Sequence, residues 1–240
     1  GTDPSAKPVS QSELSFGAEK KLSEDISVSS RVVYKHLIRT IEDVGYLNAD
    51  GDEEYIISNP GFGLARPVAQ GGLFSDTYWP CPKAKREYWA INLSLEKRFS
   101  HNWQGGVNYT WSATSGNYGG LWSSDENGRQ GPNVDRYFDL WFERFDLSGN
   151  PLNGFLPSDR SHYFKVFGSY SFPFGVTVGT VAYGRSGTPR TTMFPMNDVT
   201  AVPNGYGDLG RLPFLFTADL YAEYTLKLGK RYAVQLNATV

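Results

Sequence analysis

One acidic segment of the chain has residue types and spacing suited to binding a metal ion. The segment Asn48-Ala-Asp50-Gly51-Asp52-Glu53-Glu54 places side-chain oxygens at alternate positions around a glycine. Calcium loops use oxygen ligands arranged in this way. The later acidic ligand of such a loop is not in register, because Asn59-Pro60 occupies that region. Asn48, Asp50, Asp52 and Glu54 are therefore candidate calcium ligands, and the alternative is an ordinary solvated loop tip.

The three histidines and Ser186 do not form a catalytic pattern. His101 falls in a short turn, and His36 and His162 fall on the outward-facing positions of expected strands. Ser186 lies in Gly184-Arg185-Ser186-Gly187, which lacks the glycine spacing of a nucleophile elbow. The sequence therefore predicts no enzyme and no cofactor apart from the candidate calcium ion. Anchoring at a membrane interface is the expected role of the two strand histidines.

Aromatic residues gather in the long segments between the expected strands. Aromatic rings can stack on sugars or flat chelates at the entrance to a binding site. The alternative is that these rings pack the long segments onto themselves. The candidate ligand-binding residues are Trp79, Trp122, Tyr137 and Trp141.

The composition excludes several classes of protein. The 240 residues include 23 basic and 25 acidic side chains, and the basic residues are scattered, so no nucleic acid partner is expected. No run approaches the roughly 18 apolar residues of a membrane-spanning helix, and no basic-then-apolar leader opens the chain. The single cysteine, Cys81, cannot form an internal disulfide or a zinc site with other thiols.

Alternation of apolar and polar residues decides the fold class. Over the predicted strand 103–115, apolar or small residues take the odd positions up to Ala113 and mostly polar residues take the even ones, which is the period of a β-strand. The same pattern predicts strands at 12–20, 26–39, 87–97, 161–172, 176–186, 214–228 and 232–240. We therefore expect an all-β protein of eight strands in four hairpins, with short turns at about 21–25, 99–102, 173–175 and 229–231.

Strand length and loop asymmetry favour a transmembrane antiparallel β-barrel over a soluble sandwich. Strands of globular proteins usually run about 5 to 6 residues, whereas a tilted membrane strand needs about 9 to 11 or more. The expected hairpins are joined by long segments at about 40–86, 116–160 and 187–213. Short turns at one end and long loops at the other are typical of outer-membrane barrels.

The aromatic residues on the apolar faces have the spacing of a membrane girdle. Trp103 and Trp111 are eight positions apart, a separation of roughly 20 Å along the axis of a tilted barrel. Outer-membrane barrels carry an aromatic girdle on each side of an apolar band about 25 Å tall. Outer-membrane lipid is thus an expected partner. The expected girdle residues are Trp89, Trp103, Trp111, Phe164, Phe172, Phe216, Tyr224 and Tyr232.

The polar faces of the strands are expected to line the lumen. Their charged residues are Arg31, Lys35, Arg39, Glu96, Lys165, Asp219, Glu223 and Lys227. Both signs occur, without the single-sign ring of a strongly selective pore. Eight strands enclose an interior only just wide enough for side chains. The last strand stops in mid-alternation at Val240 without a terminal aromatic, so we expect a piece of a larger barrel.

Four stretches of the chain resemble the late barrel strands of TonB-dependent outer-membrane receptors, especially those with an N-terminal carboxypeptidase-regulatory-like domain. They are Tyr88 to Tyr118, Leu152 to Gly179, Gly184 to Arg190 and Leu220 to Val240. The resemblance implies a 22-stranded barrel, a plug inside it and a periplasmic TonB-type energy transducer as partner. The plug, the TonB-contacting segment, a signal peptide, roughly the first 13 strands and the final strand are not among these 240 residues.

We therefore expect part of a TonB-dependent receptor in the outer membrane of a Gram-negative-type bacterium. The whole receptor would import a bulky, scarce ligand of the siderophore, glycan or peptide class into the periplasm. The first alternative is a structural or adhesive surface barrel without transport. The second is a soluble sugar-binding β-domain.

Overall fold

The protein forms one long antiparallel sheet of eight strands. The computed structural model describes residues 1–48, 50–73, 81–120, 138, 146–148, 150, 152–196, 199–229 and 231–240. In the order of the sheet the strands are β1 (Ser10–Lys21), β2 (Ile26–Arg39), β5 (Arg86–Ser100), β6 (Trp103–Gly116), β7 (His162–Ser171), β8 (Val176–Arg185), β11 (Leu215–Leu228) and β12 (Tyr232–Thr239). The prediction of eight strands in four hairpins is confirmed.

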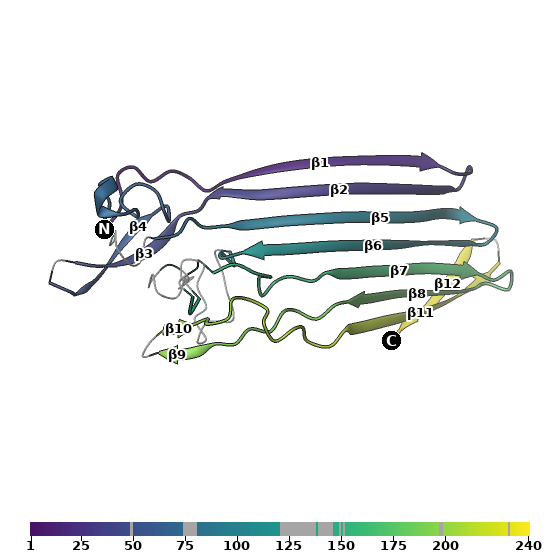
Figure 1. Cartoon of the computed structure of the whole chain (residues 1–240). Coiled ribbons are helices and arrows are strands. Elements are labelled where there is room, and N and C mark those ends of the chain that lie inside the picture. The colour runs from purple at the N-terminus through teal and green to yellow at the C-terminus, as the bar shows by residue number, and fades with distance from the viewer. Residues whose placement is uncertain are drawn as a thin grey trace.

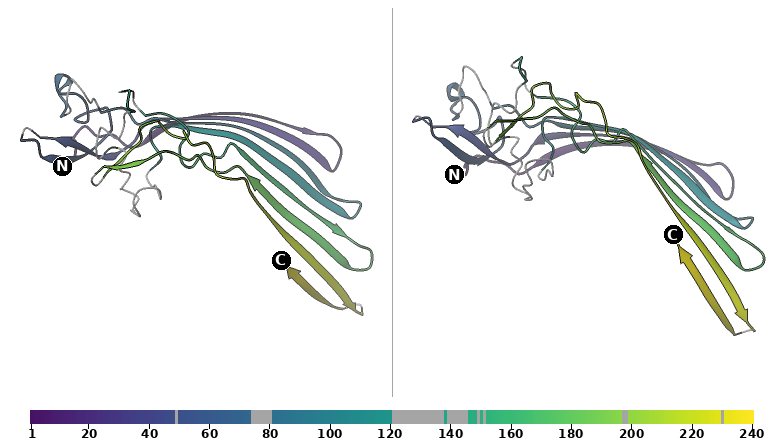
Figure 2. Two further views of the ribbon diagram at one scale, coloured as in Figure 1. Left: turned by 60° about the horizontal axis from the view of Figure 1, so that its bottom comes forward. Right: turned by 90° about the horizontal axis from the view of Figure 1, so that it is seen from below.

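The two ends of the sheet differ as the connection lengths predict. The hairpin turns lie at one end, and the long connections lie at the other end together with the N-terminus (Figure 1). Figure 2 shows that the sheet is curved along its length. Strands β1 and β12 form its two edges. Among the described residues, no helix has the length and hydropathy needed to cross a membrane.

The turn between β5 and β6 is tighter than the sequence indicates. Only His101 and Asn102 lie between the paired residues Ser100 and Trp103, and both have positive φ, 51° and 66°. This is the type I′ geometry that suits the right-handed twist of a hairpin, and Asn adopts it at low cost. Next to this turn, Lys97 Nζ forms an ion pair of 3.1 Å with Asp25 Oδ2 in the turn between β1 and β2. The two neighbouring turns are thereby fixed to each other.

The long connections contain secondary structure that the sequence does not predict. They hold the hairpin of β3 (Glu42–Leu47) and β4 (Glu53–Ser58), the 3-10 helix η1 (Val68–Gln70), and the hairpin of β9 (Phe194–Met196) and β10 (Val199–Ala201). Each of these elements has six residues or fewer. A pattern so short shows too few alternations to be recognised.

The buried apolar core of the described residues lies among these connections. We call the described parts of 40–85, 117–161 and 186–214 the loop cap. Val44, Ala65 and Leu156 in the loop cap are fully buried, at 0% exposure. They belong to a cluster with Leu37, Ile56, Cys81, Ala84, Tyr118, Phe138, Leu152, Val202 and Tyr206. The loop cap is therefore packed like a small globular domain.

A buried ion pair fastens the loop cap to the sheet. The carboxylate of Asp159 is fully buried, and its Oδ1 accepts a hydrogen bond of 2.6 Å from the backbone amide of Thr114 at the end of β6. Its Oδ2 forms an ion pair with Arg211 Nη2. Arg211 also lies over the ring of Phe155, 5.1 Å from its centroid. Two distant connections and the end of one strand thus meet at a single carboxylate.

A second buried carboxylate, Asp3, organises the N-terminal segment. Its oxygens accept hydrogen bonds from the amide and hydroxyl of Ser5, from the hydroxyl of Ser58 and from the amide of Leu64. Burial alone would raise the pKa of Asp3, but the hydrogen bonds from Leu64, Ser5 and Ser58 lower this pKa to about 2. The folded chain therefore stabilises the ionised form of Asp3.

We predict that Asp159→Asn loosens the loop cap. Asp159 is fully buried but its partner Arg211 is 26% exposed, so the expected cost is the loss of hydrogen bonds to a charged group, about 1.5 to 3 kcal/mol, and not that of a fully buried unpaired charge. Asp208→Asn is the matched control, because Asp208 is an exposed carboxylate in the same region that bonds to Thr192 and Asn204. Hydrogen exchange of the full-length protein measures the effect at residues 152–161. Equal exchange in the two variants would contradict the assigned role of Asp159.

We predict that the contribution of Asp3 disappears in acid. Its folded pKa lies below its unfolded value, so the stabilisation is complete above about pH 4 and is lost as the pH falls toward 2. Hydrogen exchange at Leu64 is compared between the wild type and Asp3→Asn over this range. The variant exchanges faster at neutral pH, and the difference narrows toward pH 2. A difference that does not depend on pH would refute the assignment.

Candidate functional site

The strand register places the apolar positions of all eight strands on one face of the sheet. Leu95, Val107 and Val166 are direct partners across β5, β6 and β7, and directly paired residues point to the same face. We call this the apolar face. Its side chains remain exposed, with Phe16 at 77% and Leu220 at 62%. An apolar surface of this extent does not face water in a stable monomer, so it requires an apolar environment.

The eight expected girdle residues lie on the apolar face in two rows. The row nearer the long connections has Trp89, Trp111, Phe164 and Phe216, and the row nearer the turns has Trp103, Phe172, Tyr224 and Tyr232. Further rings extend both rows: Tyr34 lies 4.3 Å from Trp89 and Phe174 lies 5.1 Å from Phe172, between ring centroids. Their contact with lipid headgroups stays a prediction.

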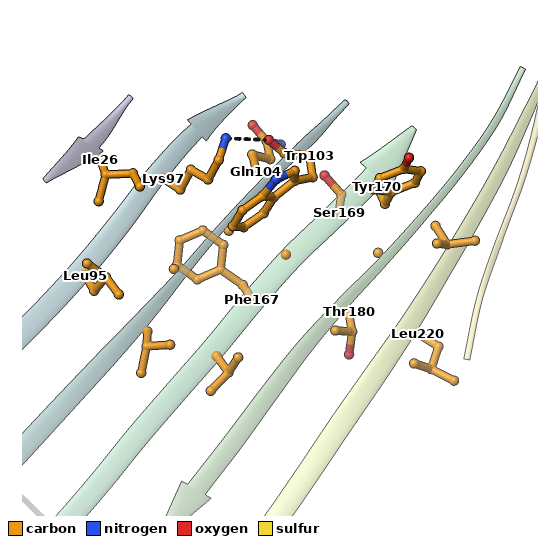
Figure 3. A pocket seen from close by; sticks show the side chains of 17 residues that line it. Ile26, Leu95, Lys97, Trp103, Gln104, Phe167, Ser169, Tyr170, Thr180 and Leu220 are labelled. Atoms are coloured by element: carbon orange, nitrogen blue, oxygen red, sulfur yellow. Dashed lines mark hydrogen bonds between the residues drawn. The ribbon is translucent and has the colours of Figure 1, made fainter. Parts of the chain in front are cut away.

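A wide hollow of about 890 Å³ lies near the turn end of the sheet, and it is lined mainly from the apolar face (Figure 3). Gly105 and Gly168 are paired across β6 and β7 and leave its floor without side chains, between Trp103 and Tyr170 on one side and Leu95 on another. Lys97, at its edge, donates a hydrogen bond of 3.3 Å to the carbonyl of Trp103 (Figure 3). Hydrocarbon chains suit this hollow better than a polar ligand does.

The opposite face of the sheet, which we call the polar face, is lined by hydroxyl, amide and charged groups. Thr110 donates a hydrogen bond of 2.8 Å to Asn92, and Ser94 donates one of 2.7 Å to Asn108. All eight charged residues expected in the lumen lie on the polar face. Glu13, Glu19, Lys21, Arg86 and Arg185 join them. Ligand passage through a lumen would therefore take place along this face.

The histidines are separated from the polar face. His36 and His162 lie on the apolar face, opposite Ser12 and Trp111 respectively. The imidazole of His162 forms a hydrogen bond of 2.8 Å with the hydroxyl of Tyr109. Ser186 Oγ bonds to the backbone of His162 and not to its ring. Among the described residues, the rings of His36 and His162 therefore make no hydrogen bond to the Ser186 hydroxyl.

The candidate calcium residues form the turn of the β3–β4 hairpin. Asn48 Oδ1 accepts hydrogen bonds from the amides of Asp50 and Asp52, and Asn48 Nδ2 donates to Glu54. Tyr46 donates a hydrogen bond to Glu54, which lowers the pKa of this carboxyl. Over the described residues, no group of three or more His, Cys, Asp or Glu side chains is placed to hold a metal ion. Calcium at this turn stays a prediction.

Trp79, Trp122, Tyr137 and Trp141 lie outside the described residues, so their role stays a prediction. Two neighbouring aromatics, Tyr118 and Phe138, are buried in the loop cap with ring centroids 6.4 Å apart. What sequence reasoning missed is the pair Asp159–Arg211, whose members are 52 positions apart and carry no shared motif.

Two comparisons of sequence identify relatives of this chain. The profile of the outer membrane beta barrel domain family matches residues 1–187. The TonB-dependent transporter Oar of Myxococcus xanthus is 31% identical over 247 aligned positions, covering 99% of this chain and 20% of Oar. The chain thus spans about a fifth of the length of this relative. These matches confirm the resemblance to TonB-dependent receptors and the predicted barrel fold.

A comparison of structures finds a mutant of the ferric enterobactin receptor PfeA of Pseudomonas aeruginosa. The similarity covers 97% of this chain and 28% of the receptor chain, with a TM-score of 0.40 and 16% sequence identity.

We predict that a lysine at the centre of the apolar face lowers the stability of the protein in a bilayer more than a lysine at the next position, which lies on the polar face. Leu93→Lys places a charge in the middle of β5 and is expected to cost about 2 to 4 kcal/mol in a bilayer. Ser94→Lys is the matched control, one residue along the strand on the polar face; it removes the hydrogen bond to Asn108 and is expected to cost about 0.5 to 1.5 kcal/mol. Reversible unfolding of the full-length protein from lipid bilayers measures both. Similar losses would mean that the apolar face does not contact hydrocarbon.

Proposed function

This chain belongs to the outer membrane beta barrel domain family, and on that premise we propose that it forms part of the barrel of a TonB-dependent receptor that imports a bulky, scarce ligand. It resides in the outer membrane of a Gram-negative-type bacterium. The ligand is of the siderophore, glycan or peptide class in this proposal.

One observation carries the proposal: one face of a single sheet has exposed apolar side chains with two rows of aromatic residues, and the opposite face has mostly hydroxyl, amide and charged groups. Water-soluble sheets bury one face against another layer. In this sheet the apolar face stays open and the packed core lies in the loop cap. A wall between lipid and an aqueous lumen has this arrangement. The relation to Oar, whose name describes a TonB-dependent transporter, supports import in preference to another role of such a wall.

In the proposed mechanism each part of the whole receptor has a separate role. The loop cap captures the ligand outside the cell, and the polar face offers hydroxyl and charged groups along which it moves. A plug domain closes the lumen between transport events. A periplasmic TonB-type protein transmits the proton-motive force that displaces the plug.

The proposal can be tested before the ligand is known, by measuring which compounds the cells remove from their growth medium. Cells with and without the gene of the full-length protein grow in the same complex medium, and mass spectrometry follows the soluble compounds above the size limit of porins. We expect at least one such compound to be depleted only by cells that carry the gene. A protonophore, or deletion of the periplasmic transducer, abolishes this depletion.

The rival roles predict other results. If no compound is depleted and deletion of the gene alters surface adhesion or envelope integrity, the protein is a structural or adhesive barrel. Depletion that persists in the presence of a protonophore would also contradict energised import. A soluble sugar-binding domain finds no support, because the relatives of this chain are outer-membrane proteins.

A further inference from the structure

The charges of the polar face are distributed unequally along the strands. In the half nearer the loop cap, the cationic side chains are Lys35, Arg39, Arg86, Lys165 and Arg185, and the carboxylates are Glu13 and Asp219. In the half of each strand nearer the turns, the paired positions carry Lys21, Arg31 and Lys227 against Glu19, Glu96 and Glu223, and Arg98 lies beyond them in the bulge of β5. We call the five cations of the first half the basic belt. The basic belt carries an excess of positive charge where the lumen meets the loop cap.

Most of this positive charge is not neutralised by carboxylates of the described chain. Lys35 forms an ion pair of 3.0 Å with Glu13. Arg39 instead donates to the carbonyl of Pro8, and Lys165 lies over the rings of Phe167 and Tyr183. Within the described ranges, Arg39, Lys165 and Arg185 have no carboxylate at ion-pair distance.

A sixth cation strengthens one side of the basic belt. Arg160 lies just before β7 and donates a hydrogen bond of 2.7 Å to the carbonyl of Ser186, directly after Arg185. Burial lowers the pKa of the Arg160 guanidinium, and the positive charge of Arg185 lowers it further. Two guanidinium groups that repel each other are stabilised by an anion that contacts both.

A polar hollow lies on the other side of the basic belt. It has a volume of about 350 Å³ and is lined by Gln11, Lys35, Arg86 and Tyr88. Each of these four side chains can donate a hydrogen bond, and two of them are cationic. A carboxylate or phosphate group in this hollow would be held by charge-assisted hydrogen bonds, the strong class of such bonds.

Strands β6 and β7 lie between the two cationic regions. Ser112 and Thr114 on the polar face of β6 are buried, and Tyr163 of β7 is paired with both Thr110 and Arg185. The hollow beside Lys35 and Arg86 and the pair Arg160–Arg185 are therefore two separate contact points for acidic groups.

We propose that the basic belt binds a polyanionic ligand, one that carries clustered carboxylate or phosphate groups, as it passes from the loop cap into the lumen. This inference rests on the proposed function and names the chemical class of its substrate. A neutral sugar or a cationic peptide would offer no anionic partner to Arg39, Lys165 and Arg185, which have no carboxylate at ion-pair distance within the described ranges.

Inorganic tripolyphosphate is a suitable probe of the full-length protein. Isothermal titration calorimetry measures its affinity for the wild type, for the pair Lys35→Gln with Arg185→Gln, and for the control pair Lys21→Gln with Lys227→Gln. Both pairs remove two positive charges from the polar face. The belt pair is expected to weaken binding about tenfold or more, because a hydrogen bond to a charged group contributes a factor of this size. The control pair is expected to change it about twofold, and high salt weakens binding to the wild type.

Several results would overturn the inference. Failure of the wild-type protein to bind tripolyphosphate would mean that the positive charges are neutralised from within the whole protein, for example by its plug. Equal losses of tripolyphosphate affinity in the two double variants would mean that binding depends on the total charge of the protein and not on the basic belt. Heat-modifiable migration in gels checks that each variant is folded.

The medium-depletion experiment distinguishes a failure of this inference from a failure of the proposed function. Energised depletion of a neutral compound, unchanged in the belt pair, would leave import intact and refute the polyanionic class. Binding of tripolyphosphate that depends on the basic belt, without any energised depletion, would refute import and leave the anion site in place.

Discussion

The structure depends on the requirement that every backbone amide and carbonyl of a membrane strand be paired inside the sheet. Hydrocarbon offers no hydrogen-bond partners, and each unpaired group costs several kcal/mol. Long strands with uninterrupted antiparallel registers meet this requirement, and β5 and β6 pair over most of their length. Once these backbone hydrogen bonds are formed, successive side chains of a strand point alternately toward lipid and toward water. The apolar face and the polar face are the direct result.

The position of the hydrophobic core follows from the same requirement. A sheet between lipid and water has no second layer to pack against, so its large apolar side chains remain exposed. The residues that do pack into a core lie in the loop cap, apart from Leu37 near the end of β2. Two kinds of stabilisation therefore coexist in one chain. Strands are held by hydrogen bonds and lipid, and the loop cap is held by burial and by the carboxylates Asp3 and Asp159.

Much of the sheet could be predicted from the sequence, because period-2 alternation over ten or more residues has a single structural meaning. The strand between Trp103 and Gly116 was predicted to within one residue. Short elements such as β3 and β9 escaped prediction, because three to six residues show no clear period. The arrangement of the polar face was harder to predict from the sequence. Arg86 and Arg185 are 99 positions apart in sequence, and only the register shows that they share a face.

The packing of the loop cap has a consequence for recognition at the mouth of the barrel. Asp159 and Arg211 join two connections that are also linked by the β-bridge between Gly154 and Tyr206 and by their shared core. Segments already held in place lose little conformational entropy when another molecule settles against them. For the ligand of the proposed import, a given set of contacts on the loop cap would then yield tighter association than the same contacts on loose segments, and selection by shape would add to selection by charge.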